Sequence, residues 1–232
     1  MRADRYAMLM SSLPHLGPLF RAKERPLTRV QLEGRLRLLE PEDARILRRI
    51  ENTLRWAVLA PGTSDREQAE RGRAVIGELD DPTLREAVAR RLEARTLIAA
   101  LRRRRDGQRP PADPAELGYH RQADALVRRW DARGFGLARH APWLGTAEDH
   151  LRAGDSEALE RLLLRQASDD LAYLGRGHAF DFTAVVLYVL KWDLMDRWMR
   201  YDGTAARARF ERIAGAALAR YGQILAPEAQ RG

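Results

Sequence analysis

The sequence predicts an all-α protein, a multi-helix bundle made of two packed helical lobes. Three observations predict this class: helix-start signals are dense, apolar residues recur at helical spacing, and signals for β-strands are nearly absent. The stretch Tyr6–Leu13 is the one exception, since its residues suit a short N-terminal strand as well as a helix. Either outcome keeps the rest of the chain helical.

The first half of the chain is predicted to form four helices, each with a recognisable start. The start signals are Thr28 with Gln31, Pro41, Ser64 with Glu67, and Asp81 before Pro82. The helices are expected over residues 28–38, 41–59, 65–79 and 82–106. Pro61-Gly62 and Gly107 are the matching stop signals.

The second half is predicted to form five more helices. They are expected over residues 120–133, 146–153, 156–174, 182–202 and 204–221, the last ending before Gly222. The sequence "GQRPPADP" favours an extended path between the two halves. It predicts an N-terminal lobe over residues 1–107, a linker over 108–115 and a C-terminal lobe over 116–232; one continuous domain is the alternative.

Composition excludes several classes of protein. The chain of 232 residues is 45% hydrophobic and 32% charged, which is typical of a folded, soluble domain. No apolar run approaches the roughly 18–20 residues of a membrane span. The absence of cysteine excludes disulfides, thiolate metal sites and cysteine nucleophiles. We therefore expect a cytoplasmic protein.

The net charge of +8 raises the possibility of a nucleic-acid partner. Lys23 and Lys191 are the only lysines, and arginine is spread evenly along the chain. An arginine skew of this kind is more simply explained by a GC-rich genome. Arg102–Arg105 form the last turn of a long helix, where positive charge complements the helix dipole. Since consecutive residues point around a helix, only one or two of the four, such as Arg102 and Arg103, could contact one partner surface.

The helix predicted over residues 82–106 has arginines within its apolar arc. Arg91, Arg95 and Arg102 fall near the middle of that arc on a helical wheel. An arginine among core-facing side chains either extends its charged end to solvent or meets an acceptor. These three positions therefore predict at least one buried or interfacial ion pair.

The helix predicted over residues 182–202 is apolar over most of its circumference. It includes Trp192 and Trp198, and Asp196 lies among its apolar residues. A helix of this kind belongs either to the centre of a domain or to a partner interface. A buried Asp196 requires a cation, and we expect Arg91 or Arg95 to provide it.

The motifs of common enzymes are absent from the sequence. It contains no His-Glu-x-x-His, P-loop or dinucleotide-binding glycine pattern, and its histidines are scattered. No Ser/His/Asp arrangement can be nominated from spacing. We therefore predict a protein without catalytic residues, metal ligands or cofactor, whose seven arginine, tryptophan and aspartate candidates serve structure or partner contact.

Two stretches at opposite ends of the chain resemble a poorly characterised bacterial family whose genes lie beside those of V/A-type rotary ATPases. The first comprises "RYAMLMSSLPHLGPLF" and "PLTRVQLEGRLRLLEPEDARIL", and the second is "LYVLKWDLMDRWMRYD". In addition, "EARTLIAALRRRRDG" and "VVLYVLKWDLMDRW" are similar to helices of the d-type subunit of V/A-type ATPases, which joins the central stalk to the rotor ring. Leu194 stands where that subunit has the second acid of its late helix, and this chain is shorter.

The resemblance implies a non-catalytic helical subunit or assembly factor of such an ATPase, with a central-stalk coupling role. Its implied partners are the stalk or rotor-ring subunits, with peripheral contact at the inner face of the plasma membrane through the complex. A basic surface is suited to acidic subunits or anionic headgroups. A nucleic-acid-binding helical protein is the alternative function.

Overall fold

The computed structural model describes residues 2–21, 24–54 and 64–201, and these are helical with no strand among them. The elements are α1 (Arg2–Ser12), α2 (Arg29–Leu36), α3 (Pro41–Leu54), α4 (Asp65–Glu78), α5 (Pro82–Arg105), η2 (Pro114–Leu117), α6 (Ala123–Arg128), η3 (Arg133–Gly136), α7 (Leu144–Ala153) and α8 (Ser156–Leu174). A last helix is described over residues 182–201. The all-α prediction is confirmed, and Tyr6–Leu13 takes the helical alternative.

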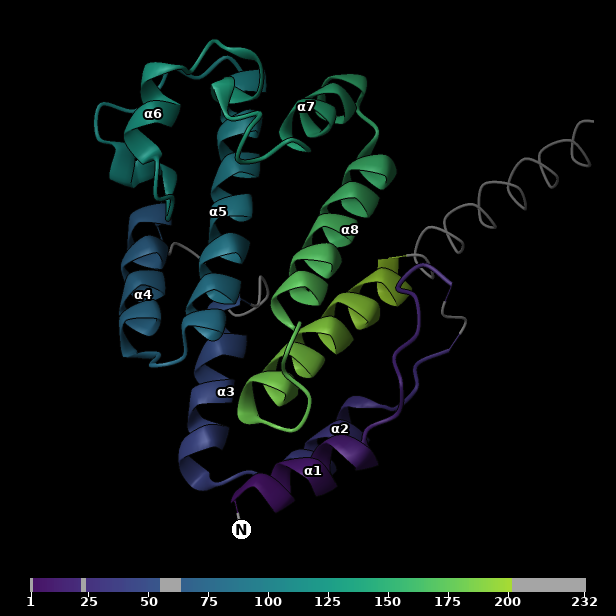
Figure 1. Cartoon of the computed structure of the whole chain (residues 1–232). Helices are drawn as coiled ribbons and strands as arrows, with labels where there is room; N and C mark the ends of the chain where they lie inside the picture. Colours follow the sequence, from purple (N-terminus) through teal and green to yellow (C-terminus); the bar gives the residue numbers. More distant parts are fainter. Residues whose placement is uncertain (1, 22–23, 55–63, 202–232) are drawn as a thin grey trace, which may run out of the picture.

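Helix α5 is the longest labelled element and forms the axis of the molecule (Figure 1). It lies between α4 and α8, and α7, α6 and η2 gather around its C-terminal end. Helix 182–201 crosses below α8 and lies close to α1 and α2 (Figure 1). Segments from the two ends of the chain are thus neighbours in space.

Two apolar clusters form the core, and α5 contributes to both. The first contains Leu84 and Leu92 of α5 together with residues of α1–α4, the second half of α8 and helix 182–201. The second contains Leu97 and Leu101 with η2, α6, η3, α7 and the start of α8. The clusters therefore do not coincide with the predicted lobes 1–107 and 116–232, because α5 and α8 each take part in both.

The local start signals operate as predicted. Thr28 and Ser64 each complete a capping box with the third residue of the following helix. Asp81 accepts hydrogen bonds from the backbone N–H groups of Thr83 and Leu84, and Pro82 follows it. These caps fix where α2, α4 and α5 begin.

The end of α5 depends on a glycine. Gly107 has φ +76°, a left-handed conformation that side chains other than glycine seldom adopt. The N–H of Gln108 then donates to the carbonyl of Arg103 at 2.9 Å, closing the last turn. Gly107 therefore ends the helix as its position in the sequence predicted.

The helix predicted over residues 120–133 is much shorter in the structure, where α6 covers only Ala123–Arg128. The guanidinium of Arg104 donates to the carbonyl oxygens of Trp130 and Ala132, at 2.6 and 2.8 Å. Those carbonyls consequently turn toward α5 and away from a helical ladder. The irregular stretch that follows packs into the second cluster, with Phe135 and Leu137 buried and Trp143 against it.

Two other predicted helices fall partly or wholly beyond the described ranges. The helix predicted over 41–59 is described to Leu54, and that over 204–221 lies outside the described residues. The helix predicted from residue 146 begins at Leu144. Within the described ranges, none of the helices combines the length and the apolar content needed to cross a membrane.

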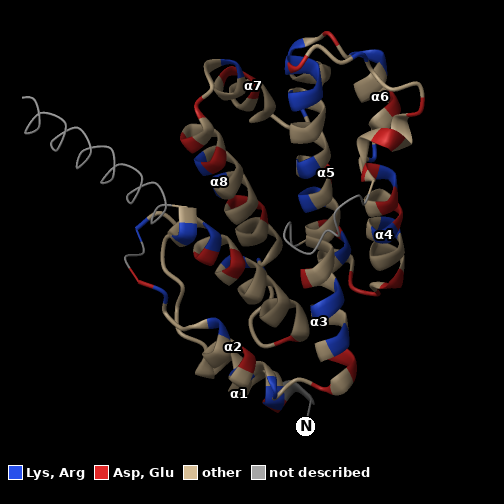
Figure 2. Ribbon diagram, turned by 180° about the vertical axis from the view of Figure 1, so that it is seen from behind, with Lys and Arg blue, Asp and Glu red and all other residues tan. Residues whose placement is uncertain are grey.

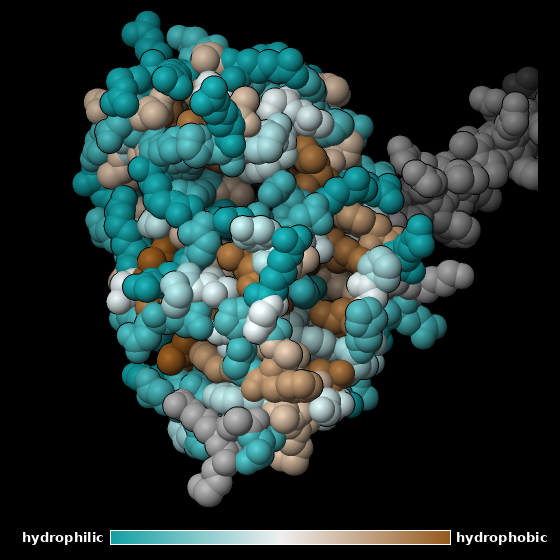
Figure 3. All heavy atoms as spheres, viewed as in Figure 1, coloured by the Kyte–Doolittle hydropathy of each residue, from teal (hydrophilic) through white to brown (hydrophobic). Residues whose placement is uncertain are grey.

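Charged residues of both signs occur throughout the described part of the chain. Figure 2 shows Lys and Arg interspersed with Asp and Glu along the helices. On the face shown in Figure 3, hydrophobic residues form separate brown patches between hydrophilic ones. Among the described residues, the large hydrophobic side chains that remain exposed are Met8, Val30, Leu38, Tyr173 and Phe180.

Candidate functional site

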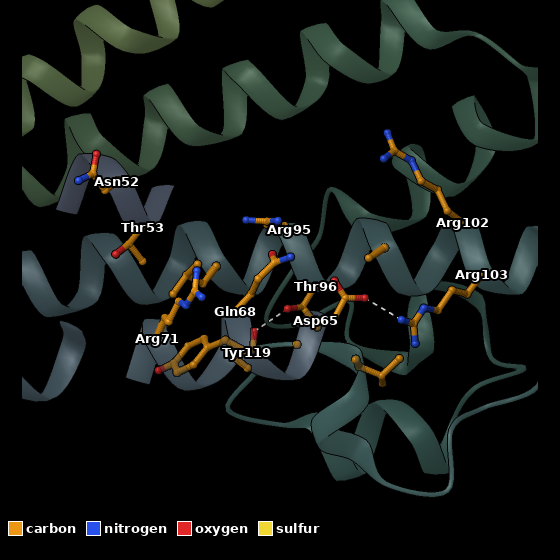
Figure 4. Close-up of a pocket in the computed structure, with 15 residues that line it drawn as sticks. Asn52, Thr53, Asp65, Gln68, Arg71, Arg95, Thr96, Arg102, Arg103 and Tyr119 are labelled. Atoms are coloured by element: carbon orange, nitrogen blue, oxygen red, sulfur yellow. Dashed lines mark hydrogen bonds and ion pairs between the residues drawn. The ribbon is translucent and has the colours of Figure 1, made fainter. Parts of the chain in front are cut away.

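Two neighbouring cavities border α5 and share part of their lining. The larger, which we call the central cavity, has a volume of about 760 Å³ and lies between α5, α8 and helix 182–201, with α2 and the end of α3 at its edge. The smaller, the η2 pocket, has a volume of about 430 Å³ and lies between α4, α5 and η2 (Figure 4). Arg95 and Arg102 line both, so the arginine line of α5 separates the two cavities.

Seven arginines and five carboxylates line the central cavity among the described residues. They are Arg29, Arg90, Arg91, Arg95, Arg102, Arg197, Arg200, Glu33, Glu160, Asp170, Asp193 and Asp196. The rest of the wall is mainly leucine, alanine, isoleucine and Trp192. The cavity therefore combines apolar walls with many charged side chains, among which the arginines outnumber the carboxylates by two.

The carboxylates of α8 in this cavity already have arginine partners. Glu160 forms a bidentate pair with Arg197, with distances of 2.6 and 2.8 Å. Asp170 accepts from Arg90 at 3.0 Å. Neither acid is therefore available as an unpaired partner for Arg91.

Asp196 is paired in a way that the sequence prediction did not anticipate. Its two oxygens contact Arg25 and Arg200, each at 2.7 Å, and its side chain is only 12% exposed. The predicted partner, Arg91 or Arg95, was wrong. Arg25 reaches Asp196 from the segment before α2, and Arg200 lies one turn further along the same helix, so both are closer than α5.

Arg91 makes no hydrogen bond or ion pair with any residue that the structure describes. It is half-buried and lines the central cavity. Burial, reinforced by the nearby charge of Arg197, lowers the pKa of Arg91 to about 10, against weaker opposing effects of Glu160, Asp170 and Asp193. Arg91 is thus a desolvated cation that faces a largely apolar space.

Hydrogen bonds between residues distant in the sequence connect the elements around the η2 pocket. Arg103 donates to Asp65 at 2.6 Å and to the carbonyl of Glu116 at 3.2 Å. Thr96 donates to the carbonyl of Tyr119 at 2.8 Å. Figure 4 shows Arg102 pointing away from the Asp65–Arg103 pair. Arg95 is half-buried, and burial lowers its pKa while Asp65 opposes the shift.

Most arginines of the run at the end of α5 form ion pairs within the protein. Arg104 contacts the buried Glu148 at 2.8 Å and lies 4.5 Å from the ring centre of Phe135. Arg105 contacts Asp106 at 2.9 Å, and Arg103 is paired with Asp65. Only Arg102 is exposed and without a hydrogen bond or ion pair among the described residues. The run is therefore a poor phosphate-binding face.

Segments from the two ends of the chain form one contact unit, which we call the N/C unit: the described residues 6–21 and 24–36 together with residues 182–201. Trp192 donates its Nε1–H to the carbonyl of Leu27 at 3.0 Å, and the Tyr188 hydroxyl donates to the carbonyl of Pro14 at 2.8 Å. Phe20 packs edge-on against Trp198 with ring centres 5.1 Å apart. Trp198 does not line either cavity.

A threonine–histidine–aspartate arrangement was missed by the sequence reasoning. His178 contacts Thr83 through Nε2 at 3.2 Å and Asp181 through Nδ1 at 2.8 Å. Asp181 accepts from the N–H of Ala184, while Thr183 donates to the α5 cap Asp81. Neither cavity includes these residues. They brace the N-termini of α5 and helix 182–201, and only the capping position of Asp81 was identified from the sequence.

The described residues contain no group of three or more histidine or acidic side chains placed to hold a metal ion. In comparisons with known proteins, no protein-family model, no curated protein and no solved structure matches this chain. The function of the chain is therefore inferred from its own residues and contacts.

Proposed function

We propose that this protein is a non-catalytic helical subunit or assembly factor of a bacterial V/A-type rotary ATPase, with a coupling role like that of the d-type subunit in the central stalk. The proposal places it in the cytoplasm, at the inner face of the plasma membrane through its complex. Its partners would be stalk or rotor-ring subunits. The basis in the sequence is the resemblance of the two end segments.

The N/C unit is the observation that carries the proposal. The two segments that resemble the ATPase-associated family are separated by about 140 residues of chain, yet they contact each other through Trp192–Leu27, Tyr188–Pro14 and Phe20–Trp198. Two patterns that occur together in a family are expected to have a joint role, and here each segment supplies the packing partner of the other. The resemblance therefore follows one structural unit of this chain, which supports a joint role for the two segments.

Nucleic-acid binding has less support. Specific and nonspecific binding to a duplex both depend on arginines and lysines that are free to contact phosphates. Arg103, Arg104 and Arg105 are engaged by Asp65, Glu148 and Asp106. The charge distribution in Figure 2 likewise shows no continuous basic stripe.

Affinity purification of the tagged protein from its native host tests the proposal. Recovery of several V/A-type ATPase subunits is expected, and Trp198→Ala should reduce it, because that change opens the N/C unit. Leu126→Ala in the second cluster is the control for general destabilisation. An equal fall in the recovery of ATPase subunits with both variants, at matched thermal stability, would contradict the proposal. So would a wild-type sample enriched only in ribosomal or chromosomal proteins.

A further inference from the structure

The central cavity has the properties of a ligand site. Its volume of about 760 Å³ lies within the range of about 300–1,000 Å³ that is typical of small-molecule cavities. Its walls come from α5, α8 and helix 182–201, at the level where α5 passes from one apolar cluster to the other. Ligand pockets between helices commonly have this location.

The charges around the cavity leave one half-buried cation unmatched. Glu160 is paired with Arg197, and Asp170 is paired with Arg90. Asp196 is paired with both Arg25 and Arg200. Arg91 has no hydrogen bond or ion pair with any described residue. A cation removed from water without a partner is unfavourable, and an anion brought into the cavity would offset that loss.

The guanidinium of Arg91 suits a small anionic group. A single planar guanidinium forms a bidentate pair with one carboxylate or one phosphate. Apolar side chains line the cavity between its charged ones: Ile98 of α5, Leu164 and Leu171 of α8, and Leu190 and Leu194 of helix 182–201. The complementary ligand therefore combines one small anionic head, for which a carboxylate is sufficient, with an extended apolar part.

A single acyl chain fits a cavity of this volume. It is narrow enough to follow the leucine-lined wall.

We propose that the central cavity binds a single-chain amphiphile with a carboxylate head, of the fatty-acid class, with its head on Arg91 and its tail along the leucines of α8 and helix 182–201. This inference is independent of the ATPase proposal, because it depends on the cavity and not on the N/C unit.

Titration of the full chain with cis-parinaric acid, a fluorescent long-chain carboxylate, tests the inference. Trp192 lines the cavity and can transfer excitation energy to the probe. Saturable binding is expected, and Arg91→Gln should weaken it by about tenfold or more. Arg85→Gln is the matched control, since Arg85 lies exposed on the same helix outside the cavity, and it should leave the affinity unchanged.

Two further measurements keep the test decisive if Arg91→Gln does not fold. Hexadecanol, which has the tail without the charge, should displace the probe from the wild type far less effectively than palmitate does. Ala94→Trp should block binding without removing charge, because Ala94 lines the cavity. Equal displacement by hexadecanol and palmitate, or undiminished binding by Ala94→Trp or Arg91→Gln, would overturn the inference.

The absence of saturable binding would also overturn it. A second result would overturn it as well: the protein floats with phosphatidylglycerol vesicles, Arg91→Gln does not change this flotation, and the monomeric probe is not bound. That result would assign the affinity to a membrane surface. Failure of this inference leaves recovery of ATPase subunits untouched, and the reverse also holds, so the two results are distinguishable.

Discussion

Arg25 and Asp196 form an ion pair of 2.7 Å between the segment that precedes α2 and the last described helix, across 171 positions of sequence. Asp196 is buried among apolar residues, and Arg200 contacts its second oxygen. The pair joins the two segments of the N/C unit. It also supplies a cation to a buried carboxylate, which would be unfavourable if it were unpaired.

Asp196→Asn should destabilise the protein. Loss of the negative charge weakens the contacts of Asp196 with Arg25 and Arg200. Because both arginines are substantially exposed, the expected loss of stability is about 1–2 kcal/mol. Urea unfolding of the variant measures it. Asp149→Asn is the control, since the Asp149–Arg133 pair is exposed on both sides and should contribute no more than about 0.5 kcal/mol. Equal losses in the two variants would show that burial of Asp196 is unimportant.

Glu148 should make stability depend on acid pH. Burial alone would raise its pKa, but the hydrogen bond from the N–H of Gly134 and the charges of Arg104 and Arg152 lower it below the ordinary 4.5. A carboxyl whose folded pKa is depressed stabilises the protein above pH 4.5, and that contribution disappears as the pH falls through the folded pKa.

Glu148→Gln is therefore expected to cost about 2–3 kcal/mol at pH 7 and much less near pH 3. Urea unfolding at the two pH values gives the comparison. A difference between variant and wild type that stays constant with pH would show that the charge of Glu148 does not contribute.

Gly118→Ala should be strongly unfavourable. Gly118 has φ +107°, and a Cβ built there would lie 2.8 Å from Oγ1 of Thr96, whose hydroxyl already donates to Tyr119. We expect a loss of about 2–4 kcal/mol from strain and the displaced hydrogen bond. The control, Gly77→Ala, lies in α4 with open space around it and should stabilise by about 0.5–1 kcal/mol. Thermal unfolding of the two variants distinguishes the two glycines, and a shift of the same sign in both would contradict this account.

Removal of the Tyr188 hydroxyl tests the N/C unit without a large change of volume. Tyr188→Phe loses the hydrogen bond to the carbonyl of Pro14 and should reduce stability by about 1 kcal/mol. In the wild type, burial raises the pKa of Tyr188 to about 12. Because the unfolded phenol ionises near pH 10, its stabilising contribution is complete below that pH and is lost between pH 10 and 12. Spectrophotometric titration of the tyrosines should therefore lose a late-titrating group in the variant.

Features set by neighbouring residues could be predicted from the sequence, and features set by distant residues could not. Ser64 with Glu67 and Asp81 with Pro82 mark helix starts because the groups that cap a helix belong to the same turn. The short α6 could not be predicted, since its end depends on Arg104 taking the carbonyls of Trp130 and Ala132.

The candidate site divides in the same way. Helical spacing placed Arg91, Arg95 and Arg102 on one line of α5, and all three line the central cavity. The partner of Asp196 was predicted wrongly because Arg25 lies in a segment without helical periodicity. The lack of a partner for Arg91 depends on how two carboxylates of α8 are paired: Glu160 with Arg197 of helix 182–201, and Asp170 with Arg90 of α5. Spacing along one helix does not determine these pairings.

The proposed binding of a V/A-type ATPase through the N/C unit can be tested with purified components, by size-exclusion co-elution of this protein with the central-stalk subunits of the same organism. We expect a single complex with the wild type and with Leu126→Ala but not with Trp198→Ala. Separate elution of the wild-type protein and the stalk subunits, with each component folded, would contradict it.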